Sequence, residues 1–155
     1  MQFHHKITVF TPTYNRAYIL ENLYRSLQRQ SCTDFEWLIV DDGSADNTRE
    51  RVQVWQQEGN PFPIRYHKQE NGGKCRAINK GLELAEGRLF LNVDSDDYLT
   101  DDAVEKVLSW ESQLPGTASS ARWRTRQGAR SCATAPCLPT AFRHLTSTPI
   151  ASQGA

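Results

Sequence analysis

The sequence predicts an α/β protein with a mostly parallel sheet and flanking helices, and three observations support this fold class. Short apolar runs alternate with stretches that repeat apolar residues at helical spacing. This alternation recurs four times in the first 110 residues or so. Polar turn residues follow most of the apolar runs, as they do where a parallel strand leads into a helix. The length of 155 residues suits one domain.

The first two predicted strands are residues 6–10 (KITVF) and 37–40 (WLIV), both rich in β-branched or aromatic residues. Between them a helix is indicated by Leu20, Leu23 and Leu27, which recur at helical spacing. A second helix is expected to begin at a capping box formed by Asn47 and Glu50. The run 63–67 (PIRYH) is the third predicted strand.

The third predicted helix spans residues 74–85 and is stopped by Gly87. The strand 89–93 (LFLNV) follows it, and a last helix is expected after Thr100, its predicted cap. The apolar positions of these two helices are Ile78, Leu82 and Ala85 in the first and Val104, Val107 and Leu108 in the second.

The charges balance overall but are unevenly distributed along the chain. Eighteen basic and eighteen acidic residues create no net field that would favour nucleic acid, so no nucleic-acid partner is expected. Every acid lies at or before Glu111, whereas residues 117–155 hold five arginines and no acid. This composition predicts a domain over residues 1–114 and an irregular, disordered tail over 115–155. We hypothesise that this Arg-, Ala- and Ser-rich tail is read out of frame.

The sequence shows neither a signal-peptide pattern nor an apolar run long enough to cross a bilayer. A cytoplasmic location is therefore expected, with peripheral association with a membrane left open. The cysteines are scattered and form no CxxC pair, which argues against a zinc site or a disulfide framework. They are Cys32, Cys75, Cys132 and Cys137.

Four polar segments follow the predicted strands or precede a predicted helix: residues 11–16, 41–44, 71–74 and 94–97. Each segment alone also suits a turn, because Asn, Asp, Gly and Ser favour turns and helix caps. In an open α/β sheet, however, ligands bind at the carboxyl ends of the strands, where all four segments would meet. Together they predict a binding site at that edge.

The residue types of these segments indicate the ligand. Carboxylates as close as those of Asp94, Asp96 and Asp97 repel one another unless a cation offsets the repulsion. Mg²⁺ and Mn²⁺ prefer such oxygen ligands and often share them with substrate phosphates. Basic residues in or just after the first and third segments suit a diphosphate, namely Arg16, Lys74 and Arg76.

Three segments together resemble the amino-terminal, donor-binding half of a family 2 glycosyltransferase, a nucleotide-diphospho-sugar transferase of the GT-A fold. They are TPTYNR, EWLIVDDGSADNT and the long stretch QENGGKCRAINKGLELAEGRLFLNVDSDDYLTDDAV. The resemblance covers residues 6 to 108 or so and implies a truncated GT-A, Rossmann-like sheet. It also implies metal-dependent, inverting transfer of a sugar, commonly from a UDP-sugar, to a hydroxyl of a saccharide or lipid-linked acceptor.

The resemblance also implies roles for individual residues. Those beside the nucleotide would be Thr11, Thr13, Tyr14, Asn15 and Arg16, with Asp42, and Asp41 in a shared role, accepting a hydrogen bond from the base. Those along the nucleotide and diphosphate would be Gly72, Gly73, Lys74 and Arg76. The Asp-X-Asp element would be Asp94, near the ribose or the Mn²⁺ or Mg²⁺ ion, and Asp96, the direct metal ligand, with Asp97 structural.

Two departures from the family pattern leave the activity open. Ile78 stands where many relatives have an arginine, and no carboxylate after Glu111 can act as the general base that relatives carry in their acceptor half. No catalytic residue is therefore assigned. A catalytically inactive nucleotide-binding remnant is one alternative. The other is a response-regulator-like phosphoacceptor domain, suggested by WLIVDD and Asp94 but opposed by the lack of any lysine after Lys106.

Overall fold

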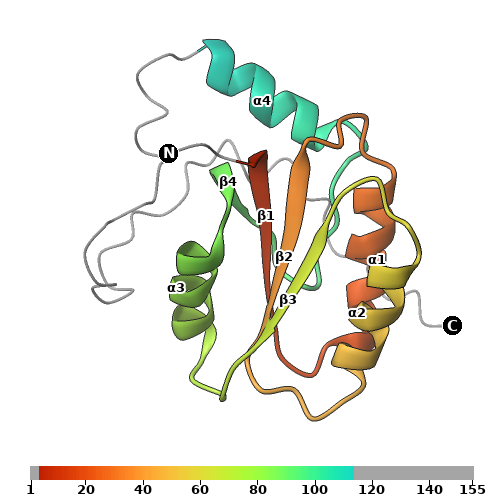
Figure 1. Cartoon of the computed structure of the whole chain (residues 1–155), viewed down its shortest axis with the longest axis vertical. Coiled ribbons are helices and arrows are strands. Elements are labelled where there is room, and N and C mark those ends of the chain that lie inside the picture. Colours follow the sequence, from red (N-terminus) through yellow and green to blue (C-terminus); the bar gives the residue numbers. More distant parts are fainter. Residues whose placement is uncertain (1–3, 114–155) are drawn as a thin grey trace, which may run out of the picture.

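The computed structural model describes residues 4–113, in which parallel strands and helices alternate (Figure 1). The strands are β1 (His5–Thr13), β2 (Phe35–Asp41), β3 (Ile64–Lys68) and β4 (Gly87–Asn92). The helices are α1 (Ala17–Gln28), α2 (Thr48–Gln57), α3 (Lys74–Leu84) and α4 (Ala103–Gln113). The predicted α/β fold class is thus confirmed. The predicted tail from residue 115 lies outside the described residues.

The four strands form one parallel sheet in the order β3-β2-β1-β4. The chain moves outward from β1 to β3 and then returns through α3 to place β4 on the other side of β1. The crossover into β4 therefore runs in the opposite direction to the crossovers that connect β1 to β2 and β2 to β3. Such a switch point leaves a crevice at the carboxyl ends of the strands, which is where open α/β sheets bind ligands.

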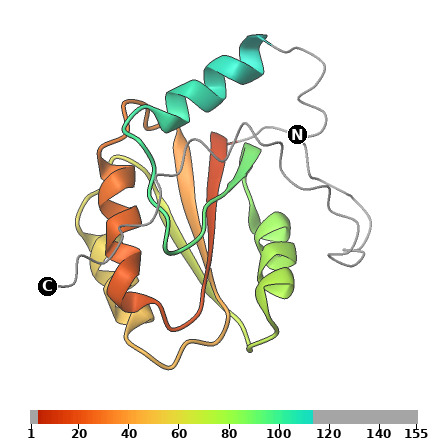
Figure 2. The same ribbon diagram turned by 180° about the vertical axis from the view of Figure 1, so that it is seen from behind.

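Helices cover both faces of the sheet, with α1 and α2 on one side and α3 on the other (Figures 1 and 2). Side chains alternate along each strand, so β2 sends Trp37 toward the first face and Leu38 toward the second. The larger core cluster includes Leu20, Val52 and Val104, from α1, α2 and α4. The smaller cluster lies under α3.

β1, β2 and β4 are longer than the sequence pattern predicts, and the extension of β1 moves part of the first polar segment into the sheet. β1 continues through Thr11 to Thr13 and pairs with β2 as far as Asp41. Its pairing with β4 ends at Phe10, two residues before Pro12. A proline is tolerated there because one side of β1 is by then free of its neighbouring strand.

The predicted capping box is wrong, although α2 does begin after Asn47. The Asn47 side chain makes no capping hydrogen bond. Asp46 takes that place: its Oδ1 accepts from the Thr48 N–H at 3.1 Å, and its Oδ2 accepts from the Ala17 N–H of α1 at 3.0 Å. One carboxylate therefore binds the first turns of two helices, where negative charge is favourable.

The structure also differs from the predicted roles of Gly87 as a helix stop and Thr100 as a helix cap. Gly87 is the first residue of β4 rather than a helix stop, and a Cβ there would lie 2.3 Å from the backbone nitrogen of Thr8. Close approach of two strands, not helix termination, requires this glycine. The Thr100 hydroxyl hydrogen-bonds with the Asp102 carboxylate at 3.0 Å, and α4 begins only at Ala103.

A buried carboxylate in β2 was missed at the sequence level. Glu36 is fully buried, and its oxygens accept hydrogen bonds from the Thr8 hydroxyl, the Arg65 guanidinium and the Glu86 N–H, at 2.5, 2.8 and 2.7 Å. Burial alone raises the pKa of Glu36, but these donors outweigh it and the pKa is lowered. The group links β1, β2, β3 and the segment that leads into β4.

Candidate functional site

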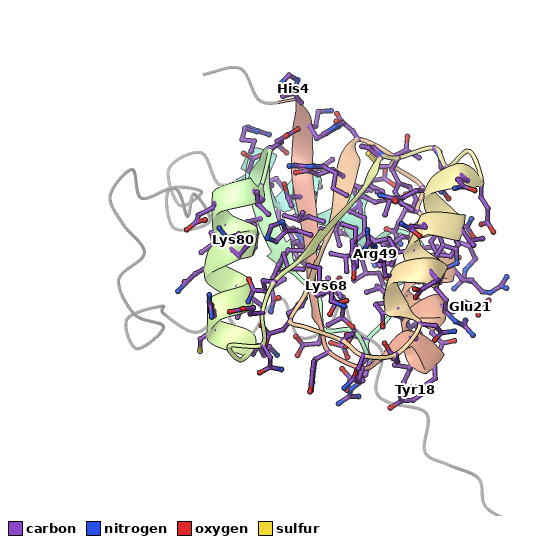
Figure 3. All side chains as sticks on the ribbon, turned by 60° about the horizontal axis from the view of Figure 1, so that its bottom comes forward. His4, Tyr18, Glu21, Arg49, Lys68 and Lys80 are labelled. Atoms are coloured by element: carbon purple, nitrogen blue, oxygen red, sulfur yellow. The ribbon has the colours of Figure 1, made fainter. Side chains whose placement is uncertain are left out.

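A pocket of about 320 Å³ lies where β1, β2 and β4 end and α3 begins. Figure 3 brings this edge of the molecule forward, with Tyr18 of α1 and Lys68 of β3 labelled near it. All four predicted polar segments are on this edge, and residues from each of them line the pocket. The lining residues are Pro12, Thr13, Tyr14, Arg16, Asp42, Lys74, Ala77, Asp94, Ser95 and Asp96.

Asp42 is a nearly buried carboxylate that the surrounding backbone holds in one orientation. Its own N–H donates to the Thr13 carbonyl at 2.9 Å, which continues the pairing of β1 with β2. Its carboxylate accepts from the Gly72 and Gly73 N–H groups, at 3.0 and 2.7 Å, and from Gln69 Nε2 at 2.7 Å. Burial raises the pKa of Asp42, but these donors more than compensate and the pKa is lowered. Asp42 is therefore an ionised acceptor facing the pocket.

The start of α3 supplies a cation to the same pocket. Gly73 has φ of 85°, a left-handed conformation that glycine adopts without strain, and Lys74 is the first helical residue. Lys74 lines the pocket, whereas Arg76 is exposed outside its lining and packs against Gly72. Ile78, the departure from the family pattern, packs against the apolar cluster under α3 instead of facing the pocket.

The acidic segment after β4 meets these cations. Lys74 Nζ lies 2.7 Å from Asp94 Oδ2, and Arg16 Nη1 lies 3.7 Å from Asp96 Oδ2. Asp94 Oδ1 is buried and has no hydrogen-bond partner among residues 4–113. Asp97 stays outside the pocket lining; burial, and then the charges of Asp94 and Asp96, raise the pKa of its carboxyl.

The donor set is compatible with a divalent cation, since the Asp94 and Asp96 carboxylates share one pocket and one buried Asp94 oxygen is uncommitted. Within residues 4–113 no three His, Cys, Asp or Glu side chains are grouped closely enough to hold a metal ion by themselves. Mg²⁺ and Mn²⁺ do not require such a cage, because they often bind through one or two carboxylates plus substrate phosphates and water.

The sequence of the chain matches the model of a known protein family. The family model described as "Glycosyl transferase family 2" matches residues 8–131, most of the chain. The chain belongs to this family. Its four-stranded parallel sheet is the GT-A, Rossmann-like sheet that the resemblance implied. The comparisons support neither the inactive remnant nor the phosphoacceptor domain.

Several known glycosyltransferases are similar to this chain over two thirds of its length or more. TuaG of Bacillus subtilis (strain 168) is 38% identical over 104 residues, which are 67% of this chain and 41% of that protein. The S. aureus TarS 1-349 structure in complex with UDP-GlcNAc has a TM-score of 0.64 at 27% identity, and the match covers 81% of this chain and 37% of TarS 1-349. The mannosyltransferase PcManGT from Pyrobaculum calidifontis, in complex with GDP-Man and Mn²⁺, has a TM-score of 0.66 at 26% identity. The match covers 74% of this chain and 34% of PcManGT. The chain thus spans less than half the length of these relatives.

The side chains of three residues that the family 2 resemblance placed beside the nucleotide hydrogen-bond to other parts of the protein. The Thr11 hydroxyl is buried and accepts from Trp37 Nε1 at 3.0 Å. The Asp41 carboxylate accepts from the Ser44 N–H at 2.7 Å and from the Tyr66 hydroxyl. Asn15 has φ of 52° and its side-chain oxygen accepts from the Ala45 N–H at 2.8 Å. None of the three lines the pocket.

Three pocket residues were not singled out from the sequence: Pro12, Ala77 and Ser95. Ala77 is apolar and lies outside the predicted segments, so only the pitch of α3 places it at the pocket. Pro12 lies within the first predicted segment but has no polar side chain to mark it. Ser95 lies within the acidic segment and could have been found from its position between Asp94 and Asp96. Gln69, which orients Asp42, precedes the predicted segment by two residues.

Among residues 4–113, no helix is both long and apolar enough to span a lipid bilayer.

Proposed function

We propose that this chain forms the donor site of a family 2 glycosyltransferase and binds a nucleotide-diphospho-sugar, with UDP as the preferred nucleotide. The observation that carries the proposal is the meeting, in one pocket, of an ionised Asp42, the Lys74 ammonium and the Asp94 and Asp96 carboxylates. Solved relatives bind UDP-GlcNAc in one case and GDP-Man with Mn²⁺ in another.

Asp42 is the proposed contact of the nucleobase. Its backbone and Gln69 donors already fix the direction of the carboxylate, so a base can meet it without a further ordering cost. An ionised carboxylate accepts hydrogen bonds only. Uracil offers one ring N–H to such an acceptor. Tyr14, half exposed at the pocket, lies where its ring could contact the base or the ribose.

Lys74 and Arg16 are the proposed contacts of the diphosphate. Both line the pocket and both pair with carboxylates there, so each side chain can exchange its carboxylate partner for a phosphate oxygen when a nucleotide binds. The α3 amino terminus begins at Lys74, directly beside the pocket, and its positive dipole end favours an anion.

Asp94 and Asp96 are the proposed ligands of a Mn²⁺ or Mg²⁺ ion that the diphosphate shares. When bound, such an ion stabilises the negative charge of the departing nucleoside diphosphate. The role of the chain's own residues is to hold the donor: Asp42 at the base, the cations at the phosphates and the acidic segment at the ion. Asp97 remains outside this set, consistent with the structural role proposed for it.

The complete reaction is proposed as displacement at the anomeric carbon of the donor sugar by an acceptor hydroxyl, with inversion. A general base must remove the hydroxyl proton. The chain covers 41% of TuaG and 37% of TarS 1-349, and its sequence has no carboxylate after Glu111, so we assign no base to it. Donor binding is the part of the function that this pocket supports.

Calorimetric titration of the purified chain with UDP and GDP, with and without Mn²⁺, tests the proposal. We expect Mn²⁺-dependent binding of UDP that weakens at least tenfold or so in the Asp94→Asn, Asp96→Asn double variant, because charged contacts to the ion are lost. Asp101→Asn is the matched control, since Asp101 pairs with Arg29 outside the pocket. A folded wild-type chain that binds neither nucleotide would contradict the proposal.

A further inference from the structure

We propose that Lys74 competes with the metal ion for Asp94, so that a divalent cation binds tightly only when a nucleotide diphosphate draws the lysine away. The idea rests on the proposed donor site and adds a regulation of that site. It assigns to one side chain two successive partners, the Asp94 carboxylate and then the diphosphate.

The geometry of Asp94 is the first argument. One carboxylate oxygen, Oδ2, lies 2.7 Å from Lys74 Nζ, while the other, Oδ1, is buried without a hydrogen-bond partner among the described residues. Within the described residues, only one of the two carboxylate oxygens therefore has a partner. Buried oxygens normally have a partner, so an uncommitted one on a residue of the pocket points to a ligand. Lys74 thus holds a position next to an oxygen that is suited to a cation.

The competition follows from charge. An ammonium group at 2.7 Å from Asp94 Oδ2 occupies the space that a cation bound to the same oxygen would need, and it repels a divalent ion bound to Oδ1. Arg16 lies 3.7 Å from Asp96 Oδ2 and adds to this repulsion. Without nucleotide, the pocket already has a cation at each of the two proposed metal ligands.

The exchange is feasible because the Lys74–Asp94 pair is accessible. The two side chains are 54% and 39% exposed, so their ion pair is screened by water and weakly held. The lysine stem is long and flexible, and a diphosphate in the same pocket offers more negative charge than one aspartate. By linkage, if nucleotide favours the metal, then the metal favours nucleotide by the same factor.

Lys74→Gln and Lys80→Gln form a matched pair of variants for the test. Lys80 lies on the same helix (Figure 3) but pairs with Glu83, outside the pocket. Mn²⁺ alone would be titrated by electron paramagnetic resonance, and UDP with Mn²⁺ present by calorimetry. We expect Lys74→Gln to bind Mn²⁺ alone about fivefold more tightly than wild type and UDP more weakly. Lys80→Gln should change neither affinity.

The two affinities separate the possible failures. Equal Mn²⁺ affinity in the two variants, with unchanged circular dichroism, would overturn the competition at Asp94. Unchanged UDP affinity in Lys74→Gln would overturn the transfer of the lysine to the diphosphate. A wild-type chain that binds no nucleotide with Mn²⁺ would overturn the proposed donor site itself, and the Mn²⁺ titration would still decide the competition.

Discussion

Glu36 is a charged residue in the middle of a buried strand, where apolar side chains are the rule. Its carboxylate is fully buried, yet three donors from different segments satisfy it, and Arg65 supplies the opposite charge. Breaking such a pair by removing one partner is costly, because the other partner is left without compensation. Glu36 therefore fixes the position of the segment between α3 and β4 relative to the sheet.

The lowered pKa of Glu36 makes the stability of the protein depend on pH. A carboxyl whose pKa is lower in the folded than in the unfolded chain stabilises the fold above its unfolded value, here 4.5. This contribution is lost as the pH falls below 4.5 and through the folded-state pKa. We expect the free energy of unfolding to decline over that acidic range in wild type and to decline less in Glu36→Gln.

Urea denaturation between neutral pH and about pH 3 would measure this dependence. At neutral pH the Glu36→Gln variant should lose about 2 kcal/mol, the scale of a hydrogen bond to a charged group. Glu50→Gln is the control, because Glu50 is exposed on α2 and the change should leave both stability and its pH profile close to wild type. Parallel pH profiles for wild type and Glu36→Gln would contradict the assignment.

At the residue scale, the sequence alone identifies Asp42, Lys74, Asp94 and Asp96 because their position after a strand or before a helix predicts the pocket edge. It does not show that Asp42 lines the pocket while the adjacent Asp41 does not. Successive strand residues point to opposite faces, and the partner that engages Asp41 is Tyr66 of another strand. That contact depends on strand register, which spacing along the chain does not reveal.

At the scale of the elements, all four strands and four helices are predicted from periodicity, and the errors lie at their ends. β1 gains three residues at its carboxyl end, because pairing with β2 extends it into a segment with the composition of a turn. The starts of α1 and α2 both depend on Asp46, and no local pattern would indicate its contact with the Ala17 N–H, 29 residues away in the sequence. Tertiary contacts therefore set the ends of these elements.

A substitution of Gly87 tests the close approach of β4 to β1. A Cβ at this position would lie 2.3 Å from Thr8 N and 2.5 Å from Ile7 C, which are backbone atoms that cannot rotate aside. We expect Gly87→Ala to lower the free energy of unfolding by about 2 kcal/mol or more, as overpacking does. Thermal denaturation would measure it. Gly59→Ala is the comparison, since nothing lies within 4 Å of a Cβ there and only its φ of 69° opposes the change. Equal losses in the two variants would contradict the close approach of β4 to β1.

At the scale of the whole molecule, the strand order explains why segments far apart in the sequence form one pocket. β4 returns to lie beside β1, so the acidic segment after β4 faces residues 12–16 and the start of α3. The sequence predicts a mostly parallel sheet and hence a common edge for the polar segments. The order of the strands, which places Asp94 against Lys74, comes from packing on both faces of the sheet.

Backbone amide chemical shifts in the isotopically labelled chain would show whether a nucleotide diphosphate binds in this pocket. On titration with UDP and Mg²⁺, we predict shift changes concentrated at Gly72, Gly73, Lys74 and Ser95, with the amides of α4 unchanged. Shift changes spread over α4 and the outer faces of α1 and α2, with the pocket amides unaffected, would contradict the account.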